Sequence, residues 1–314
     1  MTRVDLFVID GQNDFCASGK EPNEWPQPVA ERRGKPGALY VTGADEEGKR
    51  VAQMIDDLMP TNRKSGGHLI SKIHATLDKH HPNDCAHNTA WRDANGQVPG
   101  PFTIVGYDDV AQHKFHPIFA GGVWEGQPIS AFDWALKYTE ALSKRGRNPL
   151  CLWPEHCLID SWGSMVYHPL QESYHRWAKT TGGWIDYITK GQWPWTEHYS
   201  AMVADVPDPT RPETGLNTEV INDANGADIV IWSGWAGSHC LKWTALDAIN
   251  YFTQSGTNAF IAKSIFLSDA SAPVPNPPGP NAPDFGQWRT DFLNEVQTRG
   301  GKVMTCQELV AKLR

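Results

Sequence analysis

The sequence predicts an α/β fold in which a central, mostly parallel sheet of six strands is covered by helices on both faces, a three-layer αβα sandwich. Two observations predict it: short apolar runs of strand length recur along the chain, and longer amphipathic segments separate them. Strands that alternate with helices in this way form βαβ units, whose parallel strands pair in one sheet. The length of 314 residues allows one domain, because single α/β domains are often long.

Six apolar runs are the candidate strands. Val4–Ile9 ends at Asp10, and Asp228–Ser233 is the clearest strand, because its apolar residues follow one another as in a strand that is buried on both faces. The other four runs, in chain order, are His68–Leu77, Pro149–Trp153, Trp184–Thr189 and Asn258–Ile265.

Longer segments with helical spacing lie between and after these runs. The candidate helices are Glu46–Met59, Ala131–Arg145, Ser164–Lys179, Ser238–Gln254, Asp284–Thr298 and Cys306–Leu313. Two further stretches are irregular. Asn88–Gly126 is rich in Gly, Pro, His and aromatic residues, and Ala272–Pro283 contains too much Pro for a helix or a central strand. Long loops of this kind are usually functional or lie at interfaces.

The composition of the chain argues against several classes of function. The formal net charge is −8 and no run of Lys or Arg stands out, which argues against nucleic-acid binding because phosphate backbones are bound by clustered positive charge. No stretch approaches the roughly 18 apolar residues of a membrane span, and the first residues lack the apolar core of a signal peptide. The six cysteines are scattered, so we expect reduced thiols in a cytoplasmic protein.

Reactive side chains gather at the expected carboxyl ends of the strands. Asp10, Asp78, Trp153 and Lys190 end or follow candidate strands, and Cys240 lies in the loop after another. Parallel α/β sheets bind their ligands beyond this edge. The five residues therefore predict a single site for a small molecule.

Cys240 has the setting of a nucleophile. In IVIWSGWAGSHCLKWTALDA it follows a strand and a Gly-containing turn, and it lies in the first turn of a helix with Ser238 as a good N-cap. Free N–H groups and the helix dipole favour a thiolate there, lowering the thiol pKa from about 8.5, and the same N–H groups can hold an oxyanion. A buried cysteine that only packs fits the spacing equally well.

Asp10 and Lys190 are the partners that such a nucleophile needs. A carboxylate at the end of a buried strand can carry a proton between a thiol and a leaving amine, and an ammonium group can stabilise a thiolate. Either residue alone is more often a cap or a surface charge. Together with Cys240 they predict covalent hydrolysis of an amide.

The segments TLDKHHPNDCAHN and WPEHC offer a metal site. Asp78 and His80 are two residues apart at a strand end, His87 follows across a turn that contains Pro82, and His156 lies in the turn after another run. One carboxylate with two or three imidazoles suits Zn²⁺, Fe²⁺ or Mn²⁺. Histidines in such loops are, however, more often structural or solvated.

In their order, these motifs resemble those of the isochorismatase-like cysteine hydrolases and, among them, the nicotinamidases. The resembling segments are VIDGQNDF, TLDKHH with a later His, WPEHC with a later HP, ITKG followed by TEHYSAM, and GWAGSHCLKWTALDA. The resemblance implies the Rossmann-like three-layer fold of that family. It also implies one domain, residues 1–314, with insertions near 88–126 and 203–216 and the Pro-rich connector at 272–283.

The resemblance further implies roles for the matching residues. The catalytic triad corresponds to Asp10, Lys190 and Cys240, with Asp10 as the proton carrier and a thioester as the intermediate. The metal ligands, with zinc as the first choice of metal, correspond to Asp78, His80, His156 and, less closely because the extra His81 lengthens the turn, His87. The substrate-binding residues correspond to Phe15 and Trp153, on either side of a pyridine ring, and Tyr199.

The turn before the nucleophile matches the family in one respect and departs from it in another. The family's cis peptide falls between Trp235 and Ala236, which would turn the N–H groups of Ala236 and Cys240 towards the oxyanion. Where the family commonly has Thr-Asp, this chain has Gly237-Ser238. A structural hydrogen bonder is thereby lost, unless Ser238 caps the helix instead.

We therefore predict an amidohydrolase that releases ammonia from a small amide, nicotinamide first, with one divalent metal ion and a place in NAD salvage. A related cysteine hydrolase acting on a ureido or carbamoyl compound is one alternative, although such relatives generally lack the Asp-x-His and WPxHC set. A non-catalytic metal-binding scaffold is another, disfavoured because Asp10, Lys190 and Cys240 are all present. We also expect a homo-oligomer, with neither nucleic acid nor membrane as a partner.

Overall fold

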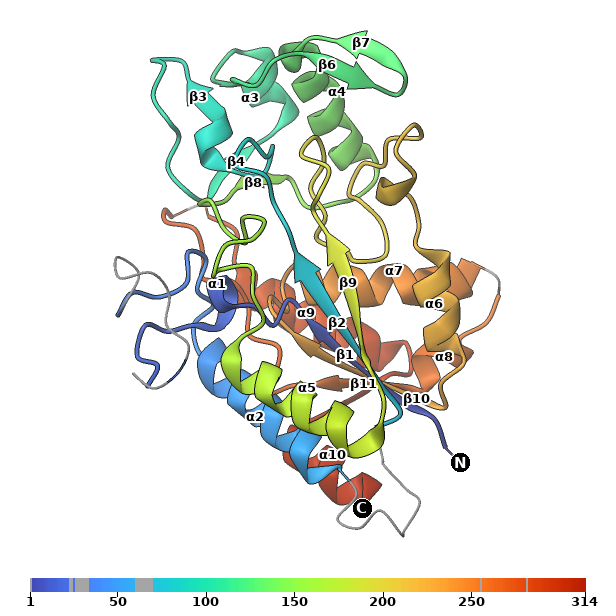
Figure 1. Cartoon of the computed structure of the whole chain (residues 1–314). Coiled ribbons are helices and arrows are strands. Elements are labelled where there is room, and N and C mark those ends of the chain that lie inside the picture. The colour runs from blue at the N-terminus through green and yellow to red at the C-terminus, as the bar shows by residue number, and fades with distance from the viewer. Residues whose placement is uncertain (1, 23–24, 26–33, 60–69, 255, 281) are drawn as a thin grey trace.

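Six parallel strands form the centre of the structure, a computed structural model that describes residues 2–22, 25, 34–59, 70–254, 256–280 and 282–314 (Figure 1). Their order in the sheet is β12-β11-β10-β1-β2-β9, and each neighbouring pair is parallel. The predicted six-stranded α/β fold is confirmed. The strands are β1 (Val4–Ile9), β2 (Lys72–Asp78), β9 (Ile185–Lys190), β10 (Ile229–Gly234), β11 (Ser264–Leu267) and β12 (Lys302–Met304).

Helices cover both faces of this sheet (Figure 1). Every residue of β1 is buried, as expected of a parallel strand with helices on either side. One face carries α2 (Ala44–Asp57), α5 (His168–Thr181) and α10 (Cys306–Leu313). The other carries α6 (Thr218–Asn225), α7 (Cys240–Gln254) and α9 (Phe285–Thr298). Two short helices, α1 (Asn13–Cys16) and α8 (Ala259–Ala262), lie in the connections.

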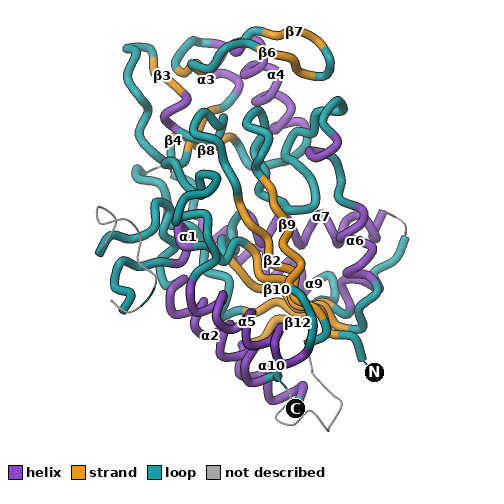
Figure 2. The backbone as a smooth tube through the Cα atoms, viewed as in Figure 1, coloured by secondary structure: helices purple, strands orange, loops and turns teal. Residues whose placement is uncertain are grey.

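A second group of elements lies beyond the carboxyl ends of β2 and β9, at the top of Figure 1. Its core is an aromatic cluster that includes Trp91, Trp124, Trp134 and Tyr138, and much of the group is loop (Figure 2). The stretch Asn88–Gly126, which was expected to be irregular, therefore contributes to a second, small hydrophobic core beyond the carboxyl ends of β2 and β9. The elements are η3 (Asn88–Ala90), β3 (Trp91–Asp93), β4 (Thr103–Val105), α3 (Tyr107–Ala111), β5 (Phe115–Pro117), β6 (Gly122–Trp124), β7 (Gln127–Ile129), α4 (Ala131–Lys144), β8 (Leu150–Leu152) and, in a later loop, η4 (Pro212–Thr214).

Two of the predicted strands were wrong in part. Pro149–Trp153 contains β8, which pairs antiparallel with β4 outside the central sheet; the sixth central strand is β12. Strands of three residues carry too little periodicity to reveal which partner they choose. In Asn258–Ile265 the first part is the helix α8, and only the end belongs to β11.

The helices differ from the prediction as well. The helix expected from Ser164 begins at His168 and has Pro169 in its first turn, where the fixed φ of proline suits a helix start. The helix α6 was not predicted. Residues 68 and 69 of the predicted strand His68–Leu77 lie outside the described residues.

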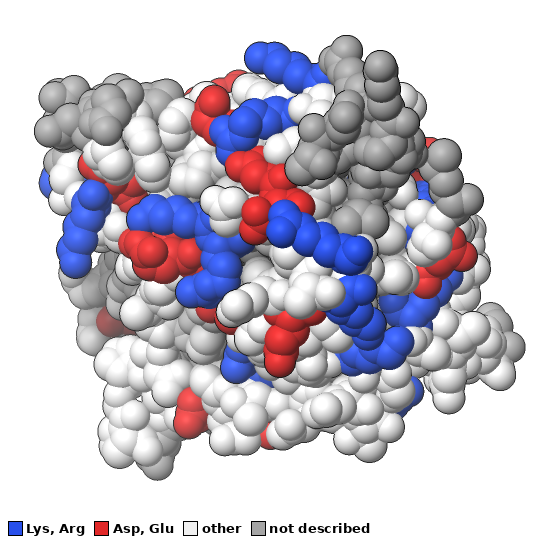
Figure 3. Space-filling model, turned by 90° about the horizontal axis from the view of Figure 1, so that it is seen from below, with Lys and Arg blue, Asp and Glu red and all other residues white. Residues whose placement is uncertain are grey.

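The surface at the amino ends of the strands carries mixed charge. Figure 3 shows basic and acidic side chains interspersed on this face. Two ion pairs reach α2, Arg176 with Asp56 at 2.5 Å and Arg314 with Asp57 at 3.4 Å. Among the described residues, none of the helices has the length and apolar content needed to cross a membrane.

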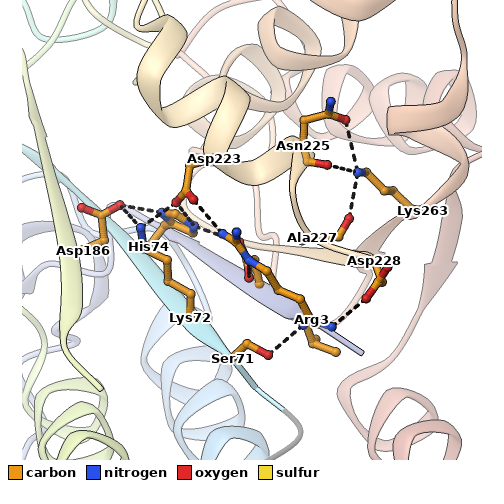
Figure 4. A network of polar contacts seen from close by, with 12 residues as sticks. Arg3, Ser71, Lys72, His74, Asp186, Asp223, Asn225, Ala227, Asp228 and Lys263 are labelled. Atoms are coloured by element: carbon orange, nitrogen blue, oxygen red, sulfur yellow. Dashed lines mark hydrogen bonds and ion pairs between the residues drawn. The ribbon is translucent and has the colours of Figure 1, made fainter. Parts of the chain in front are cut away.

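A network of charged side chains joins the amino ends of β1, β2 and β9 (Figure 4). Arg3 Nη2 lies 2.7 Å from Asp5 Oδ2 and 2.8 Å from Asp223 Oδ1. The buried ring of His74 places Nδ1 2.8 Å from Asp186 Oδ2 and Nε2 3.4 Å from Asp5 Oδ2. Burial alone would lower the pKa of His74, but its hydrogen bonds to Asp186 and Asp5 raise it above the ordinary value.

Replacing His74 with glutamine is expected to destabilise the protein more at pH 5.5 than at pH 9. A raised pKa in the folded state means that protonated His74 adds stability, which is fully present below the unfolded pKa of about 6.5 and is lost as the pH rises through the folded pKa. Urea unfolding of both proteins at the two pH values measures the difference. A matched control is His175→Gln on α5, whose side chain is exposed and should change stability by less than about 0.5 kcal/mol. Equal losses for His74→Gln at both pH values would contradict the expectation.

Candidate active site

Three charged residues meet where parallel strands end. Asp10 directly follows β1, Asp78 is the last residue of β2, and Lys190 is the last residue of β9. Asp78 and Lys190 are partners in the register of the β2–β9 pair. Cys240 follows β10 across a turn and is the first residue of α7. The sequence-based expectation that these residues share one edge of the sheet is confirmed, whereas Trp153 directly follows β8, which lies outside that sheet.

The ammonium group of Lys190 lies at the centre of this group. Its Nζ is 2.9 Å from Asp10 Oδ2, 3.0 Å from Asp78 Oδ1 and 3.7 Å from Cys240 Sγ. All four side chains are buried. A carboxylate oxygen of each aspartate and the sulfur of Cys240 lie within 4.8 Å of one another. A proton can therefore pass between the thiol and Asp10 after only a small movement.

The Asp10 carboxylate is held by a residue that the sequence analysis did not identify. Thr76 Oγ1 donates a hydrogen bond to Asp10 Oδ1 at 2.6 Å and accepts one from the Asp10 amide at 3.0 Å. Asp10 itself has a φ of 51°, a left-handed conformation that Asp tolerates better than most residues. The side chain of Gln12 links the two strand ends, since its amide accepts from Asp78 N at 2.7 Å and donates to Asp78 O at 2.8 Å. Thr76 and Gln12 thus fix the acid pair.

The buried charges shift one another's pKa values. Burial would raise the pKa of Asp78, but the positive charges of His80 and Lys190 hold it well below its usual value. Burial would lower the pKa of Lys190, but Asp10 and Asp78 raise it well above the usual value. For Asp10, burial outweighs the attraction of Lys190, and the pKa is raised. Asp10 is therefore the better proton acceptor of the two carboxylates.

The pKa of Cys240 differs from the sequence-based expectation. The helix start was expected to lower it, yet burial raises the pKa of the thiol well above its usual value despite the opposing charge of Lys190. The negative charges of Asp10 and Asp78 act in the same direction as burial. The expectation was wrong because two carboxylates and exclusion from water outweigh a helix dipole. The resting group is a thiol, so a base must take its proton.

The turn before Cys240 presents two free amides. The peptide bond between Trp235 and Ala236 is cis, as the resemblance implied. Within the described part of the chain, the N–H groups of Ala236 and Cys240 donate to no acceptor. The hydroxyl of Ser238 pairs with His239 Nδ1 at 2.8 Å and accepts from Val274 N at 3.2 Å. Ser238 therefore ties the turn to the Pro-rich connector instead of capping α7.

Gly237 explains the departure from the Thr-Asp pattern. A Cβ atom at this position would collide with the carbonyl oxygen of Ser271 and would lie 2.9 Å from Cγ of Arg289. Arg289, on α9, holds that segment by donating to the Ser271 carbonyl at 3.3 Å and to the Ser271 hydroxyl at 3.1 Å. Only glycine leaves room for this close approach of backbone to backbone.

Three histidines meet beside Asp78. One ring nitrogen from each of His80, His87 and His156 lies within 4.8 Å of the others. Asp78 Oδ2 is 3.1 Å from His80 Nε2 and 3.7 Å from His156 Nε2. The predicted ligand set is thus brought together, His87 included, while the adjacent His81 is exposed.

Part of this cluster lacks hydrogen bonds. Both ring nitrogens of His87 and Nε2 of His80 are buried and make no well-aligned hydrogen bond among the described residues, although Asp78 lies beside His80 Nε2 and the backbone of Pro82 lies beside the His87 ring. Burial and the neighbouring His80 and His156 lower the pKa of His87 to about 2, so its ring is neutral and keeps a lone pair. Buried polar atoms without partners are costly in a folded protein. These side chains are therefore a group that could hold a cation.

Aromatic rings surround the two clusters. Phe15 contacts the ring of His156 edge-on, with centroids 5.5 Å apart. Trp153 donates its Nε1–H to the Tyr199 hydroxyl at 3.2 Å, and its ring is 5.3 Å from that of His239. Phe285, on α9, was not predicted to lie here, and its ring is 4.6 Å from that of His239. Its distance along the chain from every motif left no signal for it.

The comparisons with known proteins identify the fold. No protein-family model matches the sequence, and no curated protein sequence matches it. Among solved structures, an Acinetobacter baumanii nicotinamidase pyrazinamidase matches with a TM-score of 0.55 at 18% identity, covering 98% of this chain and 99% of that one. The yeast nicotinamidase matches with a TM-score of 0.55 at 17% identity, covering 96% and 99%. PnC1 from L. infantum, solved in complex with nicotinate, matches with a TM-score of 0.50 at 17% identity, covering 98% and 94%. The chain therefore has the fold of the nicotinamidases over nearly its whole length.

Proposed function

We propose that this protein is a cysteine amidohydrolase that releases ammonia from nicotinamide and forms nicotinate. The observation that carries the proposal is the position of Lys190, whose ammonium group contacts Asp10, Asp78 and the Cys240 sulfur at once. This contact joins an acid–thiol pair to the histidine cluster within one buried site. A nucleophile, a proton carrier and an electrostatic partner are the groups that covalent amide hydrolysis needs.

In the proposed reaction, Asp10 takes the thiol proton of Cys240, and the thiolate attacks the carbonyl carbon of the amide. The oxyanion accepts hydrogen bonds from the free N–H groups of Ala236 and Cys240. Asp10 then gives its proton to the amide nitrogen as the C–N bond breaks, so ammonia leaves and a thioester remains. A water molecule that loses a proton to Asp10 hydrolyses the thioester, which releases the acid and restores the thiol. Lys190 balances the negative charge at each stage.

The residues beside Asp78 fit a divalent metal ion. Three imidazoles and one carboxylate suit Zn²⁺ first, and also Fe²⁺ or Mn²⁺. The ring nitrogens of His80 and His87 that make no well-aligned hydrogen bond are explained if Asp78, His80, His87 and His156 hold such an ion. When bound, it would anchor the pyridine nitrogen of the substrate as a Lewis acid. The ligand side chains would thereby orient the amide towards Cys240.

Two kinds of observation favour a pyridine carboxamide as the substrate. The solved structures with this fold include two nicotinamidases and a protein that holds nicotinate. Phe15 and Trp153 lie near the histidines, Phe15 on His156 and Trp153 beside His87 in the backbone pairing. Flat aromatic side chains bind flat heterocycles by stacking. We assign Phe15, Trp153 and Tyr199 to the substrate pocket.

Ammonia release from a panel of amides tests the proposal. The purified protein is given nicotinamide, pyrazinamide, ureido acids and carbamoyl amines, before and after chelation and after return of Zn²⁺. We expect ammonia from nicotinamide and pyrazinamide, loss of that activity on chelation, and its recovery with metal, because the ring nitrogen and the amide must both be held.

The outcomes separate the parts of the proposal. Ammonia from ureido or carbamoyl compounds alone would contradict the substrate and leave the cysteine chemistry standing. Full activity on nicotinamide after complete removal of metal would contradict the metal-held substrate. No ammonia from any amide would favour the non-catalytic scaffold.

A further inference from the structure

Asp84 lies in the turn between β2 and η3 and is completely buried. Its two carboxylate oxygens have different partners. Oδ2 is 2.9 Å from His80 Nδ1, and Oδ1 accepts the amide hydrogen of Ala86 at 2.9 Å. The backbone carbonyl of Asp84 accepts a hydrogen bond from the His87 amide at 3.0 Å. One residue therefore contacts two of the three clustered histidines, through its side chain to one and its backbone to the other.

The contact with His80 decides which ring nitrogen is available. A carboxylate beside Nδ1 keeps the proton on that nitrogen, because an anion favours a donor over a lone pair. A ring that binds a metal ion is neutral, so its lone pair would then be on Nε2, the atom that lies 3.1 Å from Asp78 Oδ2. Histidines that bind metals usually donate their other N–H to a carboxylate or carbonyl in this way.

The neighbouring histidines show how specific this arrangement is. His156 Nδ1 lies 2.9 Å from the carbonyl oxygen of Pro154, so a neutral acceptor orients that ring. The ring of His87 has no side-chain hydrogen-bond partner among the described residues, and its polar backbone neighbour is Pro82. Of the three rings, His80 is the one whose orientation is set by a charged group away from the ligand side.

We propose that Asp84 is a positioning residue for the metal centre, which holds His80 as an Nε2 ligand and sets the turn that brings His87 beside it. The inference rests on the proposed metal-dependent function and adds a residue that no sequence motif assigned. Because the Ala86 amide fixes the carboxylate, the orientation of His80 is built into the fold before any ion binds. This preorganisation should make the site bind a metal ion more tightly.

The test is the affinity of the whole chain for Zn²⁺, measured by competition with a chromophoric chelator. Asp84→Asn keeps an oxygen for the Ala86 amide but removes the charge that faces His80. We expect about one Zn²⁺ per wild-type chain and a dissociation constant roughly 10- to 100-fold higher for Asp84→Asn. The absorption spectrum of the Co²⁺-loaded proteins should also differ, because a reoriented imidazole changes the ligand field.

Asp208→Asn is the matched control. Asp208 is buried as well, and its Oδ1 accepts the amide hydrogen of the residue two positions later, Thr210, at 2.8 Å. The Asp208→Asn variant therefore shows how much the Zn²⁺ affinity changes when an aspartate in a turn is replaced that does not contact the three histidines. We expect Asp208→Asn to bind Zn²⁺ as tightly as the wild type. Equal Zn²⁺ affinity for all three proteins would overturn the proposal.

Two further outcomes are distinct. A wild-type chain that binds no Zn²⁺, Fe²⁺ or Mn²⁺ would overturn both the metal centre and the role of Asp84. A chain that binds Zn²⁺ but leaves nicotinamide intact would contradict the proposed substrate only, since the affinity comparison does not depend on turnover.

If Asp84→Asn does not fold, Asp84→Ser is compared instead, because its hydroxyl can still accept from Ala86 but does not reach His80. Unchanged Zn²⁺ affinity in that variant would overturn the proposal equally.

Discussion

Replacing Cys240 with alanine should reduce the rate of ammonia release from nicotinamide by on the order of 10⁴-fold or more, while the protein stays folded. The loss is large because no covalent intermediate can form without the sulfur, and Asp10 then has no thiol proton to transfer. The side chain is small and buried, so its removal should cost little stability. Ammonia release under saturating substrate and a thermal unfolding curve measure the two effects.

The matched control is Cys306→Ala. Cys306 is also buried and is also the first residue of a helix, α10, but it lies far from Lys190 in the fold. We expect activity within about twofold of the wild type, since substitutions away from an active site act mainly through stability. A Cys240→Ala protein that retains wild-type activity would exclude the thioester reaction, whatever the behaviour of Cys306→Ala.

Replacing Lys190 with methionine should lower the free energy of unfolding of the metal-free protein by about 3–5 kcal/mol. Methionine fills a similar volume but leaves Asp10 and Asp78 facing each other in a buried site, with no ammonium group between them. Unfolding in urea with a chelator present gives the measurement, because a bound cation would otherwise screen the two carboxylates. Ammonia release should fall as well.

Lys72→Met tests whether burial is the cause. Lys72 also pairs with two aspartates, Asp223 at 2.6 Å and Asp186 at 3.4 Å, but this group is partly exposed to water. Exposed ion pairs contribute about 0–1 kcal/mol, so this variant should be only slightly less stable than the wild type. If Lys190→Met cost no more than Lys72→Met, the buried charge cluster would not have the energetic role assigned to it.

Much of the central sheet could be predicted because its pattern is local. Val4–Ile9 matches β1 residue for residue, and the run before Cys240 matches β10 closely, since a strand buried on both faces is apolar throughout. The strands β4 and β8 could not be predicted as a pair. Each has three residues, and their stability comes from the aromatic cluster around them, not from their own periodicity.

The same division holds in the candidate site. The position of Asp10, Asp78 and Lys190 at one edge follows from where strands end, which the sequence reveals. Thr76 and Asp84 could not be found in this way, because a threonine within a strand and an aspartate in a turn have ordinary local explanations. The expected pKa of Cys240 was wrong for a related reason. A helix start is a local feature, whereas the burial of the thiol and the charges of Asp10 and Asp78 at the ends of β1 and β2 depend on the whole fold.

The close contact at Gly237 couples two parts of the chain that are distant in the sequence. A side chain can enter the turn before the nucleophile only if the Ser271 backbone moves away, and that backbone is held by Arg289 of α9. A side chain introduced at Gly237 alone would therefore clash with the Ser271 backbone, and it needs a matching change in the segment that Arg289 holds. For protein engineers, the same contact means that a Thr-Asp turn transplanted into this chain must bring its own C-terminal packing with it.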